Sequence, residues 1–333
     1  LGLKVNDSIT TTLINESTQV KLLEKILHRS DEIPSNNIVM IQSEAEDYTY
    51  RVLNGTYCEI TGYKGTDTVI ALPSEIDGYI VQSIGNEAFK DNKNLIRVIF
   101  PETIETIGDH VFEGCTALTD VSFNEGLTNV GTYTFKGCVS LQEINLPASL
   151  VKISDRMFEG CTSLKSIVLS NNISAIGSYA FSNCTNLSEV KLSEGLTTIY
   201  AYAFQNCNGL TSIELPDSIT KLGARAFYNC QKLEEVGYPL GWTSVLDYDR
   251  HSDSYYSDSY SYYSSPFEGC SALKRIEVEE GATAIPKHAF QNMSALEEVV
   301  LPEGLETISN YAFKDCYGLS VLTLPSTVNV IGD

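Results

Sequence analysis

This 333-residue sequence contains nine cysteines, and cysteine is the residue type here with the widest range of possible chemistry. Zinc needs four converging ligands, usually from Cys-x-x-Cys or paired histidine spacings, and no Cys-x-x-Cys occurs. Asn92 and Met293 replace cysteine in two copies of the surrounding motif, so the position holds no obligatory bond. We therefore expect buried free thiols that pack as small hydrophobes, rather than disulfides. Eight of the nine follow a phenylalanine by three residues: Cys115, Cys138, Cys161, Cys184, Cys207, Cys230, Cys270 and Cys316.

Two of the four histidines, His110 and His288, come two residues before a phenylalanine. We expect this variable slot to lie exposed on the surface. No nucleophile elbow, metalloprotease histidine pair, phosphate-binding glycine loop or dinucleotide fingerprint occurs, and a repeated surface offers few asymmetric catalytic constellations. The sequence therefore predicts no enzyme, no cofactor and no metal. The same slot in other copies holds Tyr133, Tyr179, Tyr202 and Arg225.

The phenylalanines repeat with a period of 23 residues. They fall at 89, 112, 135, 158, 181, 204 and 227, and after a step of 40 at 267, 290 and 313. Residues 187–192 (LSEVKL) alternate apolar with polar side chains, which is typical of a short strand with one buried face. Each unit can bury its apolar side only against its neighbours, so the units must stack. The pattern predicts an α/β solenoid, right-handed and curved, with a parallel sheet along one side.

Glycines recur just before the phenylalanine in several copies, for example Gly131 and Gly177. We expect them to mark a turn whose backbone conformation is costly for other residues. The set is Gly85, Gly108, Gly131, Gly177 and Gly223.

An insertion at 246–263 accounts for the one step of 40 residues. Insertions in solenoids emerge as loops on one face, and tyrosine with serine is the composition of antibody loops. Low-complexity tracts of this kind are also often plain flexible inserts, so recognition loop and flexible insert both remain open. Asp247, Asp249, Asp253 and Asp258 could hold calcium, but they lack the central glycine and closing glutamate of an EF-hand loop. The candidate binding tyrosines are Tyr248, Tyr255, Tyr256, Tyr260, Tyr262 and Tyr263.

The strand residues that flank each buried position point away from the core. This predicted face is polar, leans towards acidic residues and has few of the aromatic residues that dominate binding hot spots. The face has two interpretations: an ordinary solvated sheet, and a docking surface for a partner such as a basic protein. The candidate binding residues there are Glu143, Glu189, Lys191, Glu214, Glu235, Arg275, Glu277 and Glu298.

The chain divides into three parts. Residues 1–46 do not repeat, and 17–30 place Val20, Leu23 and Leu27 on one side of a short amphipathic helix. Residues 47–84 are expected to be capping strands, with Asn54-Gly55 as the signal for a β-hairpin. Residues 85–333 hold the repeats. A solenoid needs a polar terminal cap, and 330–333 fall within a repeat, so we expect the natural protein to continue past Asp333.

The composition excludes several classes of function. The formal net charge of −21 would repel nucleic acids and anionic membranes. No stretch approaches the roughly 20 apolar residues of a membrane span. Apolar residues make up 43% of the chain, which is enough for a substantial core. We expect a monomer that interacts with neither nucleic acid nor membrane interior.

The frame of 175–192 (AIGSYAFSNCTNLSEVKL) and the entry segment 48–89 resemble the BspA-like leucine-rich-repeat proteins, many of which are bacterial surface or secreted proteins. The resemblance covers about residues 47–333. It implies a leucine-rich-repeat superhelix, a place on or outside a bacterial cell, and adhesion or partner binding. We expect a non-catalytic module for a protein ligand such as a host extracellular protein. The alternatives are a structural spacer, and glycan or calcium binding through the insertion.

Overall fold

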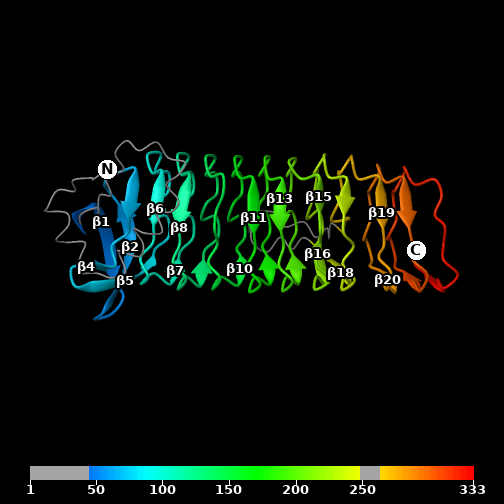
Figure 1. The fold of residues 1–333 in the computed structure, drawn as a ribbon, viewed down its shortest axis with the longest axis horizontal. Coiled ribbons are helices and arrows are strands. Elements are labelled where there is room, and N and C mark those ends of the chain that lie inside the picture. Colours follow the sequence, from blue (N-terminus) through cyan, green and yellow to red (C-terminus); the bar gives the residue numbers. More distant parts are fainter. Residues whose placement is uncertain (1–44, 248–262) are drawn as a thin grey trace, which may run out of the picture. The chain divides into compact units, whose positions relative to one another are not determined.

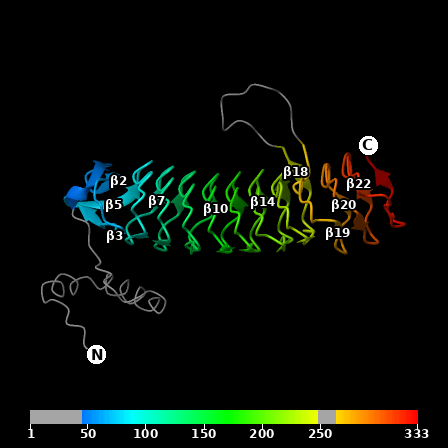
Figure 2. The same ribbon diagram turned by 90° about the horizontal axis from the view of Figure 1, so that it is seen from above.

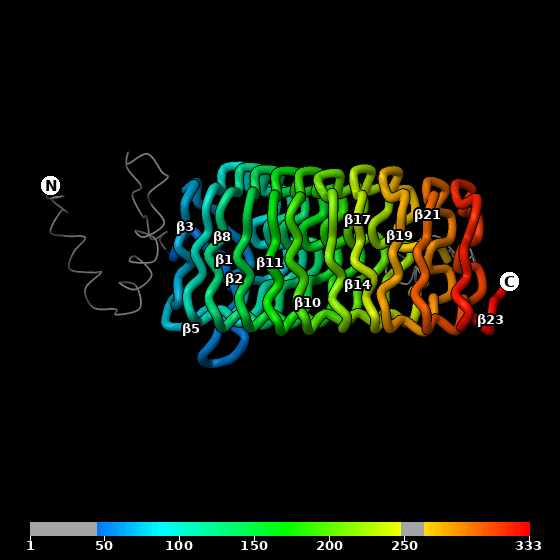
Figure 3. The backbone as a smooth tube through the Cα atoms, turned by 45° about the vertical axis from the view of Figure 1, so that its right-hand side comes forward, coloured from blue at the N-terminus to red at the C-terminus, as the bar shows by residue number. Residues whose placement is uncertain are grey.

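The structure is a computed structural model that describes residues 45–247 and 263–333. The expected helix at 17–30 and five insertion tyrosines (248, 255, 256, 260 and 262) lie outside these ranges, as do Asp249, Asp253 and Asp258. The described residues form coils that lie side by side, as Figures 1 and 3 show. They contain short strands, turns and one 3-10 turn (Ala45–Asp47), with no α-helix, so the expected α/β label is wrong for this part of the chain. The reason is that tight turns, not helices, connect the strands of each coil.

A β-hairpin begins the described solenoid, as the Asn54-Gly55 signal predicts. Strand β1 (Tyr48–Val52) pairs antiparallel with β2 (Tyr57–Tyr63). The Asn54 side chain accepts hydrogen bonds from the backbone N–H groups of Thr56 and Tyr57, at 2.9 and 3.1 Å, and this fixes the turn. The hairpin covers the first repeat, because the Tyr63 ring centre lies 5.6 Å from that of Phe89. Strand β4 (Glu75–Ile76) pairs antiparallel with β5 (Tyr79–Ile84), which follows it directly after the turn at Asp77-Gly78.

Most coils contribute strands to two faces. The first strand face carries the LSEVKL-type segments, in parallel pairs with a register of 23 residues, such as Ile167 opposite Val190. Its strands are β3 (Val69–Ala71), β6 (Arg97–Ile99), β8 (Asp120–Ser122), β11 (Ser166–Val168), β13 (Glu189–Lys191), β15 (Ser212–Ile213), β17 (Glu235–Val236), β19 (Arg275–Glu277) and β21 (Glu298–Val300).

The second strand face is a parallel ladder that sequence analysis did not expect, since it predicted a sheet along one side. The end of the second apolar segment of the repeat is also extended: Thr198 and Ile199 pair with Ala175 and Ile176 of the preceding coil and with Lys221 and Leu222 of the following one. Its strands are β5 (Tyr79–Ile84), β7 (Thr106–Ile107), β9 (Asn129–Val130), β10 (Lys152–Ile153), β12 (Ala175–Ile176), β14 (Thr198–Ile199), β16 (Lys221–Gly223), β18 (Ser244–Leu246), β20 (Ala284–Ile285), β22 (Thr307–Ile308) and β23 (Val330–Ile331). Figure 2 shows successive coils from β3 to β22 lying next to one another.

The third side of each coil is a run of tight turns around the repeat phenylalanine, which we call the turn edge. Alternate N–H groups of one coil donate to carbonyls of the next, as in Phe135 to Met157 at 2.9 Å and Phe158 to Ala180 at 2.8 Å. The phenylalanine rings stack in a buried column, with Phe158 lying 5.6 Å from Phe135 and 5.3 Å from Phe181. This column is the centre of the core.

The repeat glycines have a different role from the one expected. Gly131 and Gly177 do not have a positive φ. Instead, a Cβ on Gly131 would lie 2.4 Å from the backbone of Gly108, and one on Gly177 would lie 2.6 Å from the backbone nitrogen of Asp155. At these two glycines the preceding coil therefore lies too close for a Cβ atom.

The stack changes at the insertion. Trp242 and Val245 occupy the Leu and Ile positions of the repeat, and both are buried. Strand β17 does not pair with β19, nor β18 with β20, although the turn edge runs on. Phe227 donates its N–H to Pro266 at 2.7 Å and stacks on Phe267 at 5.4 Å between ring centres. The coils on either side of the insertion are thus joined through the turn edge.

Candidate interaction surfaces

The turn edge carries bulky side chains on left-handed backbone. Tyr133, Arg156, Tyr179, Tyr202 and Arg225 occupy the slot two residues before the phenylalanine, with φ between 56 and 59°. Such values are uncommon for residues other than Gly, Asn and Asp, and the left-handed region costs roughly 1–2 kcal/mol per residue. We call these five residues the tyrosine–arginine ladder.

Stacking along the ladder offsets this backbone cost. The Arg156 guanidinium lies 5.5 Å from the Tyr133 ring centre and 4.2 Å from that of Tyr179. Tyr179 and Tyr202 are parallel within 2°, with ring centres 4.8 Å apart, and Arg225 Nη1 donates to the Tyr202 hydroxyl at 3.0 Å. Aromatic pairs contribute about 0.5–1.5 kcal/mol and exposed cation–π contacts about 0.5–1 kcal/mol. These contacts recover part of the backbone cost of the ladder.

The ladder is half-buried and rich in the residue types of binding hot spots. Its members leave part of each side chain accessible, and tyrosine and arginine are enriched where interfaces gain most affinity. Two ion pairs fix its arginines: Arg156 with Glu159 at 3.2 Å and Arg225 with Glu268 at 2.7 Å. Burial by itself disfavours the charged form of Arg225, but the bonds to Glu268 and Tyr202 outweigh it and keep its pKa above the usual value. The ladder thus presents preorganised aromatic and cationic groups.

Beyond the insertion the same slot holds His288 and Tyr311, and the His288 ring lies between Tyr311 and Tyr263, which comes four residues before Phe267 instead of two. The His288 ring stacks on Tyr263 at 4.6 Å and on Tyr311 at 5.2 Å between ring centres. His288 is only 6% exposed, so the expectation of an exposed histidine is wrong at this position. Tyr263 stacks on His288 and helps to bury it. Because Tyr263 belongs to the far end of the insertion, the repeat pattern could not predict its position. His110 is half-buried and stacks on Tyr133 at 4.4 Å.

The predicted binding residues of the first strand face lie where sequence analysis placed them, on the outer side. They are exposed but form a column of separate side chains instead of a pocket. Arg275 pairs with Glu277 at 2.8 Å and Glu298 at 3.3 Å, and all three are well exposed. Exposed pairs of this kind contribute about 0–1 kcal/mol. The exposed set is Glu143, Glu189, Lys191, Glu214, Glu235, Arg275, Glu277 and Glu298.

The cysteine column is buried and free of disulfides, as predicted. Each thiol also has a hydrogen-bonding role that sequence analysis missed: Cys161 Sγ donates to the Phe135 carbonyl of the preceding coil at 3.1 Å, and Cys184 Sγ to Phe158 at 3.1 Å. Burial raises the pKa of Cys161 to about 12, so the thiol stays protonated at neutral pH. Within residues 45–247 and 263–333, no three His, Cys, Asp or Glu side chains gather as a metal ion would need.

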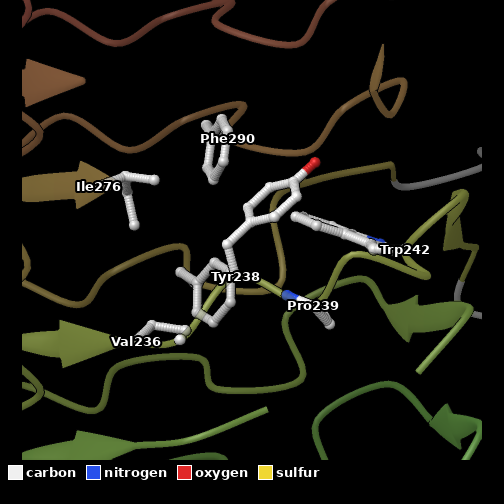
Figure 4. A pocket seen from close by; sticks show the side chains of 8 residues that line it. Val236, Tyr238, Pro239, Trp242, Ile276 and Phe290 are labelled. Atoms are coloured by element: carbon white, nitrogen blue, oxygen red, sulfur yellow. The ribbon is translucent and has the colours of Figure 1, made fainter. Parts of the chain in front are cut away.

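A small apolar pocket lies where the strands separate at the insertion. Tyr238 and Trp242 replace repeat leucines there, and Ile276 and Phe290 come from the coils that follow (Figure 4). Its cavity volume is about 10 Å³, whereas ligand pockets are typically about 300–1,000 Å³. The Tyr238 hydroxyl donates to the Ala284 carbonyl at 3.2 Å across the gap. The pocket is a packing gap with a bridging tyrosine.

The stacked coils, parallel ladders and phenylalanine column define a solenoid of the leucine-rich-repeat type. A model of the BspA type leucine rich repeat region matches six copies, over residues 82–210, 153–248 and 255–333. The chain belongs to this BspA-type repeat family. Leucine-rich-repeat solenoids are generally non-catalytic, and the family typically binds proteins or surfaces.

The first of three similar solved structures agrees on the fold. A leucine-rich repeat protein from Bacteroides ovatus is 23% identical, with a TM-score of 0.55 over 86% of this chain and 89% of that chain. A leucine rich cell surface protein from Faecalibacterium prausnitzii is 22% identical, with a TM-score of 0.35 over 86% of this chain and 93% of that one. The pneumococcal vaccine antigen PcpA is 21% identical, with a TM-score of 0.45 over 88% and 77%. No curated protein matches the sequence. In the described part of the chain, no helix is long and apolar enough to cross a membrane.

Proposed function

We propose that the chain is a non-catalytic adhesion module of a bacterial cell, displayed or released, which binds a protein partner through its turn edge. The observation that carries this proposal is the tyrosine–arginine ladder. Gly or Asn would occupy its left-handed positions at lower cost, yet the chain holds tyrosine and arginine there. Backbone strain that is retained in this way clusters at functional sites.

The charge distribution also favours the turn edge over the first strand face. In the coils of Tyr179, Tyr202 and Arg225, the turn-edge segments 177–184, 200–207 and 223–230 contain no acidic residue, although the chain has 43. The exposed binding candidates of the first strand face include Glu189, Glu214 and Glu235 in the same coils. These three segments therefore present no carboxylate of their own that would repel an acidic partner.

The test is a binding assay on the full chain with a matched pair of double variants. The labelled protein is applied to purified extracellular matrix proteins and to intact host cells, and saturable binding is measured. Tyr179→Asn/Tyr202→Asn keeps left-handed backbone accessible, as Asn183 and Asn206 already show, and should reduce affinity at least tenfold. Glu189→Gln/Glu214→Gln on the first strand face should change it less than twofold.

A further variant separates the ladder from the insertion. Serine in place of Tyr255, Tyr256, Tyr260, Tyr262 and Tyr263 should abolish binding if the insertion is the recognition loop. If only the strand-face variant or only the insertion variant loses binding, the ladder is not the binding surface. If the unaltered chain binds nothing saturably, the adhesion proposal fails in favour of a structural spacer.

A further inference from the structure

The two coils that flank the insertion are not hydrogen-bonded to each other along their strand faces. In the coils just before, Gly237 donates its N–H to the Ile213 carbonyl at 3.0 Å on the first strand face, and β16 pairs with β18 on the second. Between 234–246 and 274–286, both of which the structure describes, no backbone hydrogen bond joins one coil to the next. We call this boundary the seam.

Along the seam, two residues lack the hydrogen that joins other coils. The residue after the second-face isoleucine usually donates its N–H to the preceding coil, as Ser309 does to Ile285 at 3.1 Å. Pro286 holds this position at the seam and has no N–H. Where the seam reaches the turn edge, Met293 replaces the cysteine whose thiol donates in the coils on either side, and a thioether cannot donate.

Aromatic side chains fill the seam instead. Tyr238 and Trp242 are both buried there (Figure 4). The Trp242 ring contacts Phe267 and Phe290 edge to face, at 6.5 and 6.0 Å between ring centres. In the described coils each repeat phenylalanine stacks on the next, except that Phe267 does not stack on Phe290. Such side-chain contacts can separate without breaking a strand ladder.

The two sides of the seam are joined unequally. Among the described residues, one hydrogen bond crosses it on the strand faces, from the Tyr238 hydroxyl to the Ala284 carbonyl at 3.2 Å. On the turn edge, by contrast, the same two coils share backbone hydrogen bonds, including the one from Phe227 to Pro266 at 2.7 Å. Because the turn edge is joined and the strand faces are not, the turn edge is the axis about which the seam can open.

We propose that the seam is a hinge, at which the coils after residue 274 rotate as one body about the turn edge, and that Tyr238 is the latch of the closed state. Opening breaks the bond to Ala284 and exposes Trp242. The ladders on each side stay paired, β16 with β18 before the seam and β19 with β21 after it. The hinge changes the direction of the last coils relative to the tyrosine–arginine ladder. This inference goes beyond the proposed adhesion function and does not depend on it.

Trp242 is the only tryptophan in the sequence, so its fluorescence reports on the seam without a label. Acrylamide quenches an indole that it can touch, and its quenching rate constant is measured on the full chain under native conditions. Tyr238→Phe keeps the ring but removes the latch, and should raise this rate constant about fivefold, because the opening equilibrium loses one opposing hydrogen bond. Tyr200→Phe, the same change at an exposed tyrosine on another coil, should leave it unchanged.

Hydrogen exchange distinguishes opening of the hinge from unfolding of the last coils. The amides of Glu298 and Glu306 lie beyond the seam and donate to the preceding coil at 3.0 and 2.9 Å. They should stay as protected in Tyr238→Phe as in the unaltered chain, since the body that rotates remains folded. Unchanged quenching in Tyr238→Phe, an equal rise in Tyr200→Phe, or faster exchange of these two amides would overturn the proposal. No partner is involved, so failure here leaves the adhesion test unaffected.

Discussion

The turn edge and the two strand faces of this solenoid are built from the same coils but are organised differently. On the strand faces the strands are two or three residues long through most of the repeats, and the ladders are divided into several sheets. Along the turn edge, hydrogen bonds, thiols and phenylalanine rings connect coil to coil, and they continue past the insertion. The difference shows that the turn edge is the more continuous support for side chains. It is also where the tyrosine–arginine ladder lies.

The largest effect is expected for the phenylalanine column. Phe158→Ala should lower the free energy of unfolding by about 3–5 kcal/mol, because it leaves a cavity between two rings. Ile213→Ala, behind the first strand face, should cost about 1 kcal/mol less, since no ring stack is lost. Urea unfolding of both variants measures the difference. If Ile213→Ala lowers the free energy of unfolding as much as Phe158→Ala, or more, the phenylalanine column does not stabilise the solenoid more than the first strand face does.

A smaller effect is expected from the thiol bond between coils. Cys161→Ala should cost about 1–2 kcal/mol, because it removes the donor to the Phe135 carbonyl and some buried volume. Cys161→Ser keeps a donor at the same place and should recover part of this loss. Thermal melting of both variants provides the comparison. If serine is no better than alanine, the thiol acts as a space filler alone.

For Tyr179 in the ladder, we expect the glycine variant to be more stable than the alanine variant, the reverse of the usual order. Tyr179→Ala loses the stack with Tyr202 but keeps a left-handed non-glycine residue, so it should destabilise by about 1 kcal/mol. Tyr179→Gly loses the same stack but also relieves the backbone, and should lie closer to the unaltered chain. Chemical unfolding tests the order. If Tyr179→Gly is less stable than Tyr179→Ala, the left-handed backbone at this position is not strained.

The smallest effect concerns pH. Burial, Lys287 and Lys314 lower the pKa of His288 more than Gln291 and Asp247 raise it. The unfolded chain therefore binds the proton more readily, and stability should fall as the pH drops below about 6.5. His288→Asn should flatten this part of the curve of melting temperature against pH. A curve that is identical in both proteins would contradict the depressed pKa.

Much of the fold follows from the sequence because it depends on periodicity. The 23-residue spacing predicted stacked coils, Asn54-Gly55 predicted the hairpin, and the column of cysteines predicted unpaired thiols. Each of these signals lies within one repeat or in the interval between two. The same spacing could not show that the second apolar pair also forms a ladder, since pairing depends on the approach of neighbouring backbones.

The ladder was not predicted because its cause is not local. Tyr179 and Arg225 have no preference for left-handed backbone, and the hydrogen bonds between coils impose it on them. The signal that could have revealed the ladder is the slot two residues before the phenylalanine, in which large aromatic or cationic residues recur. The exposure of His288 was predicted wrongly because the residue that stacks on it, Tyr263, belongs to the insertion and not to the repeat.

Hydrogen exchange of the backbone amides tests most directly whether the turn edge is the continuous support of the molecule. The amides of Phe135, Phe158 and Phe181 donate to the following coil and should be among the slowest to exchange. The amides of Ser212 and Ser244, at the starts of short strands, should exchange at least tenfold faster. Slower exchange on the strand faces than on the turn edge would contradict the account.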